Sequence, residues 1–447
     1  MNEIDQIVAK LRDAGVHRVK LAATDIDGVL RGKYVSLDKF ASAYNSLGFC
    51  DVIFGWDIGD VLYDNCRYTG WHTGYPDTQA RIDLSSMRMI PWEPGTAFFL
   101  MDLLTQQGEP LVISPRQVLE GVLERAKQSG FSAKFAAEYE FWLFRETPHS
   151  LREKNFHHLT PLSPGMFGYS VLRASQNAPL VLDIIDQLAG FDVALEGFHT
   201  ETGPGVYEAA ICVDDALRAA DKAVLFKTAV KEIAARHGVL PTFMAKWSAD
   251  LPGSSGHLHQ SLGCDGNNTN VFFENGAMSP LMRQYIAGLT AFIPELMVMI
   301  APTVNSYKRT VPGTWAPINA SWGTDNRTTA IRAIMGSAKS TRIELRLSAA
   351  DMNPYLAMAA SLAAGLEGIE RKLDPPPPVV NGYEEKGCSS LPRDLGEATM
   401  QFHQSAIARK WFGDCFVEHF AGTREWELRQ YRRAVTDWEL ARYFESV

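Results

Sequence analysis

Two histidines spaced two residues apart, His257 and His259, directly follow a loop of small residues that reads PGSSG at positions 252–256. In a strand, this spacing points both imidazoles to the same face. The small residues let backbone amides approach an anion or a substrate closely. The segment is therefore suited to binding a metal or a phosphate, although two satisfied or exposed histidines beside a turn would leave the same pattern.

Glutamates with the same spacing, Glu138 and Glu140, occur inside the aromatic segment 134–144. This segment is typical of a strand, so both carboxylates should lie on one face. On an otherwise apolar strand, that arrangement costs several kcal/mol in desolvation and repulsion unless a cation lies between the carboxylates. The pattern favours a divalent metal site over its alternative, a solvated strand face.

A second pair of glutamates, Glu201 and Glu208, flanks the Gly-Pro-Gly sequence at 203–205. A turn at these residues would bring both carboxylates back to one place, as a hairpin does. For this segment considered alone, a solvated hairpin is the alternative explanation.

Arginines recur near the end of the chain's central region. Arg342, Glu344 and Arg346 alternate with apolar residues, so a strand would place all three on one face. A surface ladder of charges is the alternative. Guanidinium groups suit carboxylate and phosphate binding because their N–H groups form a planar fork. The arginines considered together are Arg309, Arg327, Arg332, Arg342 and Arg346.

The elements that must carry these residues follow from hydrophobic periodicity and turn residues. We expect helices over residues 3–14, 115–130, 214–238 and 353–372, with Asp214 capping the third. We expect strands over 19–25 and 28–35, joined by an Asp27-Gly28 turn, and over 97–100, 134–144 and 241–247. Gln, Gly and Pro residues clustered between 103 and 114 predict a domain boundary, which divides the chain into residues 1–108 and 109–447.

The composition of the 447-residue chain is ordinary for a globular protein, with 46% hydrophobic and 21% charged residues. A net charge of -9 provides no electrostatic footprint for nucleic acid or an anionic membrane. The six cysteines are scattered without a CxxC pair, which argues against a zinc ribbon and indicates a reducing cytoplasm. The chain starts with acidic residues and contains no run of about 18 apolar residues, so we expect a soluble protein that is not exported.

The ordered set of motifs resembles the glutamine synthetase family over essentially the whole chain. The matching segments are residues 25–35, Gly55-Trp56-Asp57, Pro76-Asp77, Glu138-x-Glu140, Glu201 with Glu208, the loop with His257 and His259, 305–309, Asn326-Arg327 and 342–346. The resemblance implies an α+β fold, with a small N-terminal β-grasp-like domain and a large catalytic domain whose curved antiparallel sheet lines a funnel. It also implies a homo-oligomer, a hexameric ring or a dodecamer, in which Asp57 completes a neighbouring subunit's site and helps to hold the amine.

By the same resemblance, the charged residues divide into metal, nucleotide and glutamate ligands. Glu140, Glu201 and Glu208 match the ligands of one divalent ion, and Glu138, His257 and Glu344 match those of a second, either Mg²⁺ or Mn²⁺. The residues that match contacts to substrate glutamate are Gly253, Arg309 and Arg346. Those that match contacts to ATP are His259, Ser261, Arg332, Lys339 and Arg342. Arg327 matches the arginine that stabilises the transferring phosphoryl group, and it joins Asp57 and Glu208 as a candidate catalytic residue.

The implied reaction has two steps. The γ-carboxylate of glutamate attacks the γ-phosphate of ATP to form an acyl phosphate, and an amine nitrogen then displaces phosphate. The amine must lose a proton before it attacks, so we expect a carboxylate nearby as the base.

One position departs from the family pattern. Glutamine synthetases carry a glutamate six residues after the arginine that matches Arg309, where it helps to bind and deprotonate ammonium, and this chain has Trp315 there. An indole accepts no proton, but it packs against an alkyl or aromatic amine or holds a cation on its face. We therefore expect an amine larger than ammonia, such as a polyamine or an alkylamine. The alternatives are simple packing of Trp315 in its loop, glutamine synthetase activity proper, and a catalytically inactive structural relative.

Regulation by covalent modification is not expected from the sequence. Some bacterial members of the family are adenylylated on a tyrosine, and the motif for this modification is not recognisable near Tyr383. AMP attached covalently to the purified protein would contradict this expectation.

Overall fold

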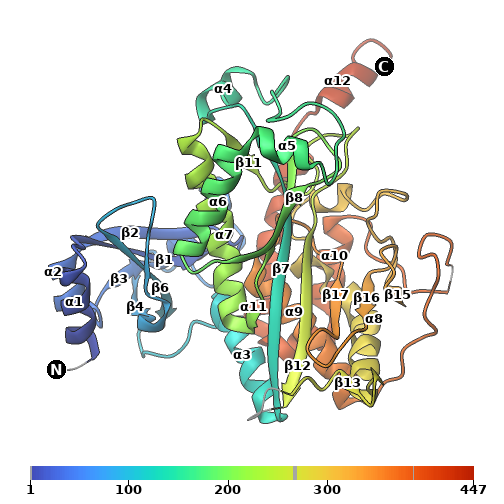
Figure 1. Cartoon of the computed structure of the whole chain (residues 1–447), viewed down its shortest axis with the longest axis horizontal. Coiled ribbons are helices and arrows are strands. Elements are labelled where there is room, and N and C mark those ends of the chain that lie inside the picture. Colours follow the sequence, from blue (N-terminus) through green and yellow to red (C-terminus); the bar gives the residue numbers. More distant parts are fainter. Residues whose placement is uncertain (1–2, 265–268, 386) are drawn as a thin grey trace.

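The computed structural model describes residues 3–264, 269–385 and 387–447. The N-terminal part of the chain forms a six-stranded sheet beside two helices, at the left of Figure 1. Its elements are α1 (Glu3–Asp13), β1 (Arg18–Thr24), β2 (Leu30–Ser36), α2 (Leu37–Ala43), β3 (Gly48–Cys50), β4 (Asp77–Ile82), β5 (Arg88–Met89) and β6 (Thr96–Leu104), with short 3₁₀ turns η1 (Asp51–Phe54) and η2 (Leu84–Ser86). The strands run in the order β2-β1-β6-β4-β3, and β5 pairs with β6.

The predicted hairpin at the start of this sheet is confirmed, since β1 and β2 pair antiparallel along their whole length. The carboxylate of Asp25 closes the turn by accepting from the backbone N–H groups of Asp27 and Val29. Gly28 has a φ of +83°, and a Cβ there would lie 3.1 Å from Asn353. Glycine is therefore required for this turn to pack against the large part of the molecule.

The large part of the chain combines a nine-stranded sheet with long helices. Its strands are β7 (Phe131–Phe144), β8 (Leu195–Thr200), β9 (Val206–Ile211), β10 (Asp214–Asp215), β11 (Leu240–Thr242), β12 (Gly256–Cys264), β15 (Trp322–Thr324), β16 (Ile331–Ile334) and β17 (Arg342–Leu345), beside the separate hairpin β13 (Phe273–Glu274) and β14 (Ala277–Met278). Its helices are α3 (Pro115–Gln128), α4 (Pro148–Glu153), α5 (Val171–Gln176), α6 (Ala178–Gly190), α7 (Ala216–Arg236), α8 (Pro280–Ile300), η3 (Ser306–Lys308), α9 (Pro354–Glu370), α10 (Leu395–Gln404), α11 (Ala406–Arg433) and α12 (Asp437–Tyr443).

The large sheet runs in the order β15-β16-β17-β12-β7-β9-β8, and β10 and β11 also pair with β7. Its described pairings are antiparallel except for that between β15 and β16. The predicted fold class, α+β with a curved antiparallel sheet in the catalytic part, is confirmed. Among the described residues, no helix is long and apolar enough to cross a lipid bilayer.

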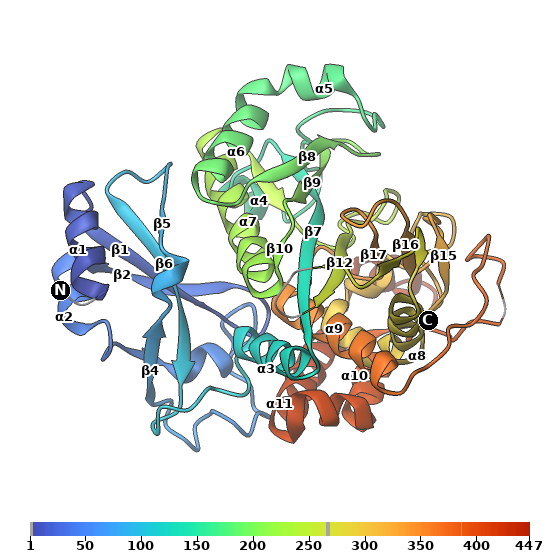
Figure 2. The same ribbon diagram turned by 60° about the horizontal axis from the view of Figure 1, so that its bottom comes forward.

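The central strand β7 separates the core from the charged face of the sheet. Phe135, Tyr139 and Phe141 are fully buried, and helices α3, α7 and α9 pack against this side of the strand (Figure 2). Glu138 and Glu140 alternate with them and face the opposite way, as the strand period requires. Burial of the aromatic side therefore fixes where the two carboxylates point.

Two details predicted from the sequence are wrong. The N-cap residue of helix α7 is Asp215 rather than Asp214. The carboxylate of Asp214 pairs instead with Lys222 at 2.8 Å. The strand predicted over 241–247 is shortened to β11 because the chain beyond it bonds to a neighbouring loop, where the Lys246 N–H donates to Asn305 Oδ1 at 2.8 Å.

Candidate active site

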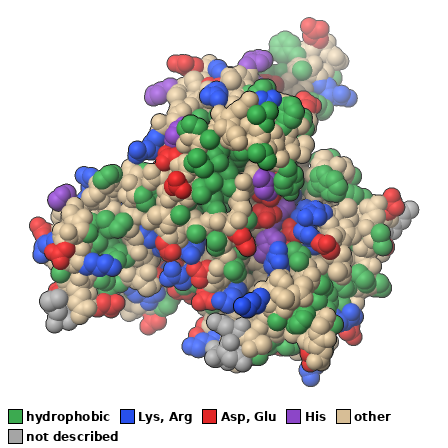
Figure 3. Space-filling view, viewed as in Figure 1, with side chains coloured by type: hydrophobic (Ala, Val, Ile, Leu, Met, Phe, Trp, Pro, Cys, Tyr) green, Lys and Arg blue, Asp and Glu red, His purple; other side chains and the backbone are tan. Residues whose placement is uncertain are grey.

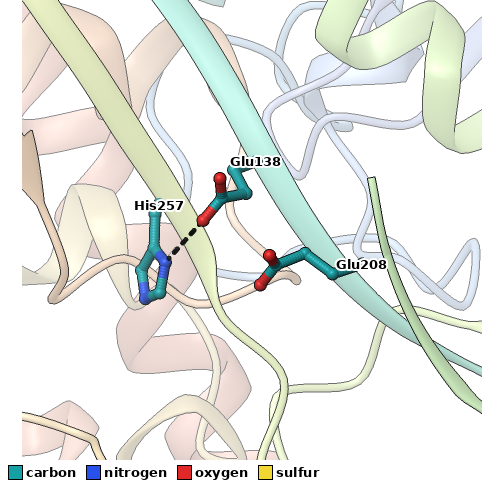
Figure 4. Close-up of side chains that lie close together, drawn as sticks. All are labelled: Glu138, Glu208 and His257. Atoms are coloured by element: carbon teal, nitrogen blue, oxygen red, sulfur yellow. Dashed lines mark hydrogen bonds and ion pairs between the residues drawn. The ribbon is translucent and has the colours of Figure 1, made fainter. Parts of the chain in front are cut away.

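Strand pairing across the large sheet brings the predicted acidic and histidine residues into one row. Glu140 on β7 lies opposite Glu208 on β9, and Glu138 on β7 lies opposite His257 on β12. Figure 4 shows Glu138, Glu208 and His257 pointing toward one another from three strands. The predicted hairpin around residues 203–205 is confirmed, and it places Glu208 beside the central strand.

The row continues on the other side of β12. His259 lies opposite Glu344 on β17, which in turn lies opposite Arg332 on β16. His257 Nδ1 is 3.3 Å from Glu138 Oε1 and 3.3 Å from Glu344 Oε1. His259 Nε2 is 3.5 Å from Glu138 Oε2. Carboxylates and imidazoles from three adjacent strands therefore converge on the space around Glu138.

The structure adds to this row a histidine that the sequence-based assignment of ligands did not include. His199 on β8 has Nε2 3.0 Å from Glu208 Oε1 and Nδ1 3.7 Å from Glu201 Oε1. Among the described residues, three groups have ligand atoms within 4.8 Å of one another: Glu138, Glu208 and His257; Glu138, His259 and Glu344; and His199, Glu201 and Glu208. Glu140 is outside these groups of described residues, and its Oε2 accepts from the Ser255 N–H at 2.8 Å.

The surroundings shift the pKa values of the acidic groups of the row in different directions. Burial raises the pKa of Glu208 to about 7, and the charges of Glu138 and Glu140 act in the same direction. Burial also raises the pKa of Glu201. Burial alone would raise the pKa of Glu138, but two neighbouring imidazoles hold that pKa well below its usual range. Burial therefore disfavours the ionised forms of Glu201 and Glu208.

This donor set fits divalent cations. Oxygen ligands outnumber imidazole nitrogens, as hard ions such as Mg²⁺ and Mn²⁺ prefer. A cation beside Glu201 and Glu208 would lower the pKa of both carboxyls, because each carboxylate would be attracted to the cation. In the space-filling view, acidic, basic and histidine side chains gather in a hollow at this face of the molecule (Figure 3).

A cavity of about 250 Å³ opens beside Glu138. Four of the five residues predicted to contact ATP line it: His259, Ser261, Lys339 and Arg342. Arg342 Nε donates to His259 Nδ1 at 3.1 Å, which leaves the His259 proton on Nε2, toward Glu138. The fifth residue, Arg332, pairs with Glu344 at 2.9 Å and does not line this cavity.

Two buried arginines form a second wall of the site. Arg309 Nη2 donates to the three carbonyls of residues 346–348 at 2.8–3.1 Å, and burial lowers the pKa of Arg309 to about 10. A Cβ at Gly253 would lie 2.5 Å from Arg309 Cγ, so the loop glycine allows the arginine to take this position. Arg346 pairs with Glu344, while Arg346 Nε is buried without a hydrogen-bond partner among the described residues.

The predicted site residues Arg327, Trp315 and Asp57 each lie on a loop. Arg327 is exposed between β15 and β16. Trp315 is 67% exposed and has a φ of +59°. Asp57 lies in the N-terminal part of the chain, where its Oδ2 accepts from Trp426 Nε1 at 2.8 Å. Within its own chain, Asp57 is therefore bound to helix α11.

Tyr169 is a further residue at this site that the sequence reasoning missed. Its ring stacks on that of His199 with centroids 4.4 Å apart, yet its side chain is 70% exposed. Burial of the phenol, together with the charges of Glu201 and Glu208, raises the pKa of Tyr169. His199 has a sequence signal, since it precedes Glu201 at strand spacing, whereas Tyr169 lies in a loop without any comparable pattern.

The fold and site together define a class of protein: an α+β enzyme with a row of carboxylates and imidazoles that could hold metal ions, next to a wall of two buried arginines. The family description "Glutamine synthetase, catalytic domain" matches residues 112–443. The chain belongs to the glutamine synthetase family.

Relatives with several printed activities resemble this chain along nearly its full length. It is 48% identical to "Type-1 glutamine synthetase 2" of Dictyostelium discoideum, covering 100% of this chain and 87% of the relative. It is 40% identical to "Glutamate--isopropylamine ligase" of Pseudomonas sp, covering 98% of each, and 37% identical to "Gamma-glutamylethanolamide synthetase" of Streptomyces coelicolor, covering 99% and 96%. The solved structure "GmaS/ADP complex" superposes with a TM-score of 0.85 at 28% identity, covering 98% of this chain and 99% of that one.

Proposed function

We propose that this protein joins the γ-carboxylate of glutamate to an amine larger than ammonia, with ATP converted to ADP and phosphate. The observation that carries the proposal is the position of the metal-binding row between the cavity beside Glu138 and the wall of Arg309 and Arg346. Family membership and the ligase activities printed for the relatives support the same reaction class. The intact row also argues against a catalytically inactive structural relative.

In the first step, the arginine wall orients glutamate and the cavity holds the nucleotide. Arg309 and Arg346 would bind the carboxylates of glutamate, since buried guanidinium groups favour anionic partners. A γ-carboxylate oxygen attacks the γ-phosphorus of ATP, ADP leaves, and γ-glutamyl phosphate forms. Exposed Arg327 would turn inward to neutralise charge on the transferring phosphoryl group.

The carboxylates and imidazoles of the row would hold two divalent ions, Mg²⁺ or Mn²⁺. We assign Glu140, Glu201 and Glu208 to one ion and Glu138, His257 and Glu344 to the other. His199 and His259 lie within reach of the same groups. Bound ions would supply positive charge next to the phosphates, and the protein's own part is to fix the ligands on neighbouring strands.

In the second step, the amine nitrogen attacks the acyl carbon, the bond between that carbon and the bridging oxygen breaks, and inorganic phosphate leaves with this oxygen. An ammonium must first give its proton to a carboxylate, for which Glu208 and Asp57 are our candidates. The Tyr169–His199 stack and the exposed Trp315 provide aromatic surface that suits the carbon body of an organic amine. Ammonia gains little from such surface, so an alkylamine or a polyamine is our choice.

We also propose a homo-oligomer, a hexameric ring or a dodecamer, in which Asp57 serves a neighbouring copy. Support comes from apolar side chains exposed at and after α12, including Trp438 (62%) and Phe444 (81%), which invite burial against another subunit. The division into domains at residues 108 and 109 and a cytoplasmic location belong to the same proposal. Light scattering of the purified protein should give six or twelve copies, and a monomer would contradict the shared site.

The test of the proposed reaction is phosphate release from ATP with glutamate and Mg²⁺ or Mn²⁺, across ammonia, methylamine, isopropylamine, ethanolamine, putrescine and spermidine. We expect one organic amine to be turned over well above ammonia. A clear preference for ammonia would make the protein a glutamine synthetase. No amine-dependent release with any of them would contradict the proposed reaction.

A further inference from the structure

Arg327 lies in the loop between β15 and β16, and its side chain makes no bond that would fix its position. It is exposed, and no hydrogen bond or ion pair joins its guanidinium group to any described residue. The residues on either side of it, Asn326 and Thr328, are instead held by several hydrogen bonds. The loop therefore combines a fixed backbone with an arginine side chain that is free to turn.

Asn326 bonds with both ends of its side-chain amide. Its Nδ2 donates to the carbonyls of Val379 and Val380, each at 2.9 Å. Its Oδ1 accepts from the Thr328 N–H at 2.9 Å and from the Thr328 hydroxyl at 2.8 Å. One side chain thus closes the turn around Arg327 and ties that turn to the segment between α9 and α10.

This segment, residues 374–385, forms a strap that is itself joined to the large sheet. Trp322, the first residue of β15, bonds to the strap twice. Its Nε1 donates to the Pro376 carbonyl at 2.6 Å, and its carbonyl accepts from the Val379 N–H at 2.9 Å. Because Trp322 is only 3% exposed, the strap has a buried anchor.

Two glycines let the strap and the loop approach each other closely. The Gly382 N–H donates to Thr328 Oγ1 at 2.9 Å, and a Cβ at Gly382 would lie 2.3 Å from the Thr328 carbonyl oxygen. A Cβ at Gly323 would lie 2.9 Å from the Val379 carbonyl oxygen and 3.0 Å from Asn326 Cβ. The strap therefore supports the loop on both sides of the arginine.

The backbone position of an exposed arginine matters for its reach. An arginine side chain has several rotamers, so the place of its Cα decides which points the guanidinium group can reach. A catalytic group displaced by about 1 Å can lower a rate by about 100-fold. An exposed loop lacks the apolar packing that fixes buried segments, so hydrogen bonds such as those of Asn326 must hold it in place.

We propose that Asn326 is a positioning residue, which holds the loop on the strap so that the Arg327 guanidinium group meets the phosphoryl group during its transfer. This inference rests on the proposed function and deepens it, because Asn326 belongs to a matched sequence motif but has no role among the candidate site residues. An amide is suited to this role, since its two N–H groups and its oxygen bind the strap and the loop at the same time.

The substitution Asn326→Ala removes the whole amide. We expect kcat to fall about tenfold, with KM for glutamate and for ATP within twofold of wild type, because Arg327 is assigned to the transition state. Thr328→Val is a second variant of similar shape, which removes the acceptor of the Gly382 N–H and should also lower kcat. It keeps the test available if Asn326→Ala fails to fold. Phosphate release with the best amine of the panel above measures both variants.

A double variant that combines Asn326→Ala with Arg327→Gln separates positioning from a general loosening of the structure. If Asn326 acts through Arg327, Asn326→Ala should lower kcat about tenfold in the wild-type protein and less than twofold in the Arg327→Gln variant. Asn353→Ala is the matched control, since Asn353 Nδ2 also donates to two carbonyls, those of residues 25 and 26 at 3.3 and 3.2 Å. Any effect of Asn353→Ala should be the same in both backgrounds.

The possible results separate this inference from the proposed function. An equal loss of kcat from Asn326→Ala with and without Arg327→Gln would overturn the positioning role, because the effect would then not depend on the arginine. A kcat within twofold of wild type in both Asn326→Ala and Thr328→Val would overturn it as well. Failure of the wild-type protein to release phosphate from ATP with glutamate and any amine would instead contradict the proposed function.

Discussion

The two sides of the site are built differently. The row of carboxylates and imidazoles stands on paired strands, where Glu344 is 1% and His257 is 4% exposed. The side that would meet the amine is formed by loops, where Tyr169 is 70% and Trp315 is 67% exposed. Both of these aromatic residues also have positive φ values, at +54° and +59°. In the proposed function, phosphoryl chemistry therefore depends on a fixed scaffold, and the choice of amine depends on loops, which tolerate change more readily.

This contrast agrees with the relatives. Proteins named as a glutamine synthetase, a glutamate–isopropylamine ligase and a γ-glutamylethanolamide synthetase all match this chain over nearly its whole length. One fold can serve several substrates when the site on that fold varies. The predictions below test the two sides separately, from the largest expected effect to the smallest.

The strand side should be intolerant of change. Glu138 belongs to two of the three groups of ligand atoms, so Glu138→Gln should lower kcat/KM by about 1,000-fold, or ~4 kcal/mol. Glu196→Gln is a suitable control, because Glu196 lines the same cavity but belongs to none of these groups among the described residues. Equal losses of activity in both variants, measured by phosphate release, would show that the row is no more important for activity than the residues around it.

Acid sensitivity of the fold should arise away from both sides. His419 in α11 is 3% exposed with neither ring nitrogen bonded to a described residue, and burial lowers the pKa of His419 to about 4. In the unfolded chain, His419 is protonated below about pH 6.5. In the folded chain, His419 stays neutral until the pH falls to about 4. Stability should therefore fall as the pH drops through this window, by on the order of 3 kcal/mol for this group.

The variant His419→Gln measures that contribution, since glutamine does not titrate. Urea unfolding at a fixed protein concentration should show a shallower loss of stability between pH 6.5 and 4.5 than in the wild type. Identical slopes would show that acid sensitivity comes from other groups, including the carboxylates of the site. If those carboxylates were responsible, the same groups would govern both the loss of activity and the loss of stability at low pH.

The loop side should change preference rather than abolish chemistry. Trp315→Glu restores an acid where glutamine synthetases carry one, so the ratio of ammonia to alkylamine turnover should rise about tenfold, or ~1.4 kcal/mol. Trp315→Phe keeps an aromatic ring and should preserve the wild-type preference. An unchanged ratio in Trp315→Glu would remove this residue from the specificity argument.

The sequence predicts the strand side of the site well because strand period and local spacing carry the information. Glu138 with Glu140 and His257 with His259 are each two residues apart, and the register between strands then joins them. His199 was recoverable from the same period, since it precedes Glu201 by two residues. The prediction of Asp214 as the helix cap is wrong, because the Asp214 carboxylate pairs with Lys222 and Asp215 is the N-cap residue.

Contacts made through loops were not predictable from the sequence. Tyr169 stacks on His199 across a long stretch of chain without a periodic pattern. Its position depends on a loop in which Tyr169 itself has a φ of +54°, which only a folded chain displays. Asp57 requires still more, because its proposed partner lies in another subunit.

The most direct test of the account is a competition measured by mass spectrometry of the products. The protein would receive glutamate, ATP and Mg²⁺ with equal concentrations of ammonia and isopropylamine, and released phosphate would be measured in parallel. We predict that γ-glutamyl-isopropylamide exceeds glutamine, with one phosphate released per amide formed. Glutamine as the main product, or amide formation without an equal amount of phosphate, would contradict the central claim. That claim is that the strands of the sheet carry out phosphoryl transfer and that aromatic residues on the loops select the amine.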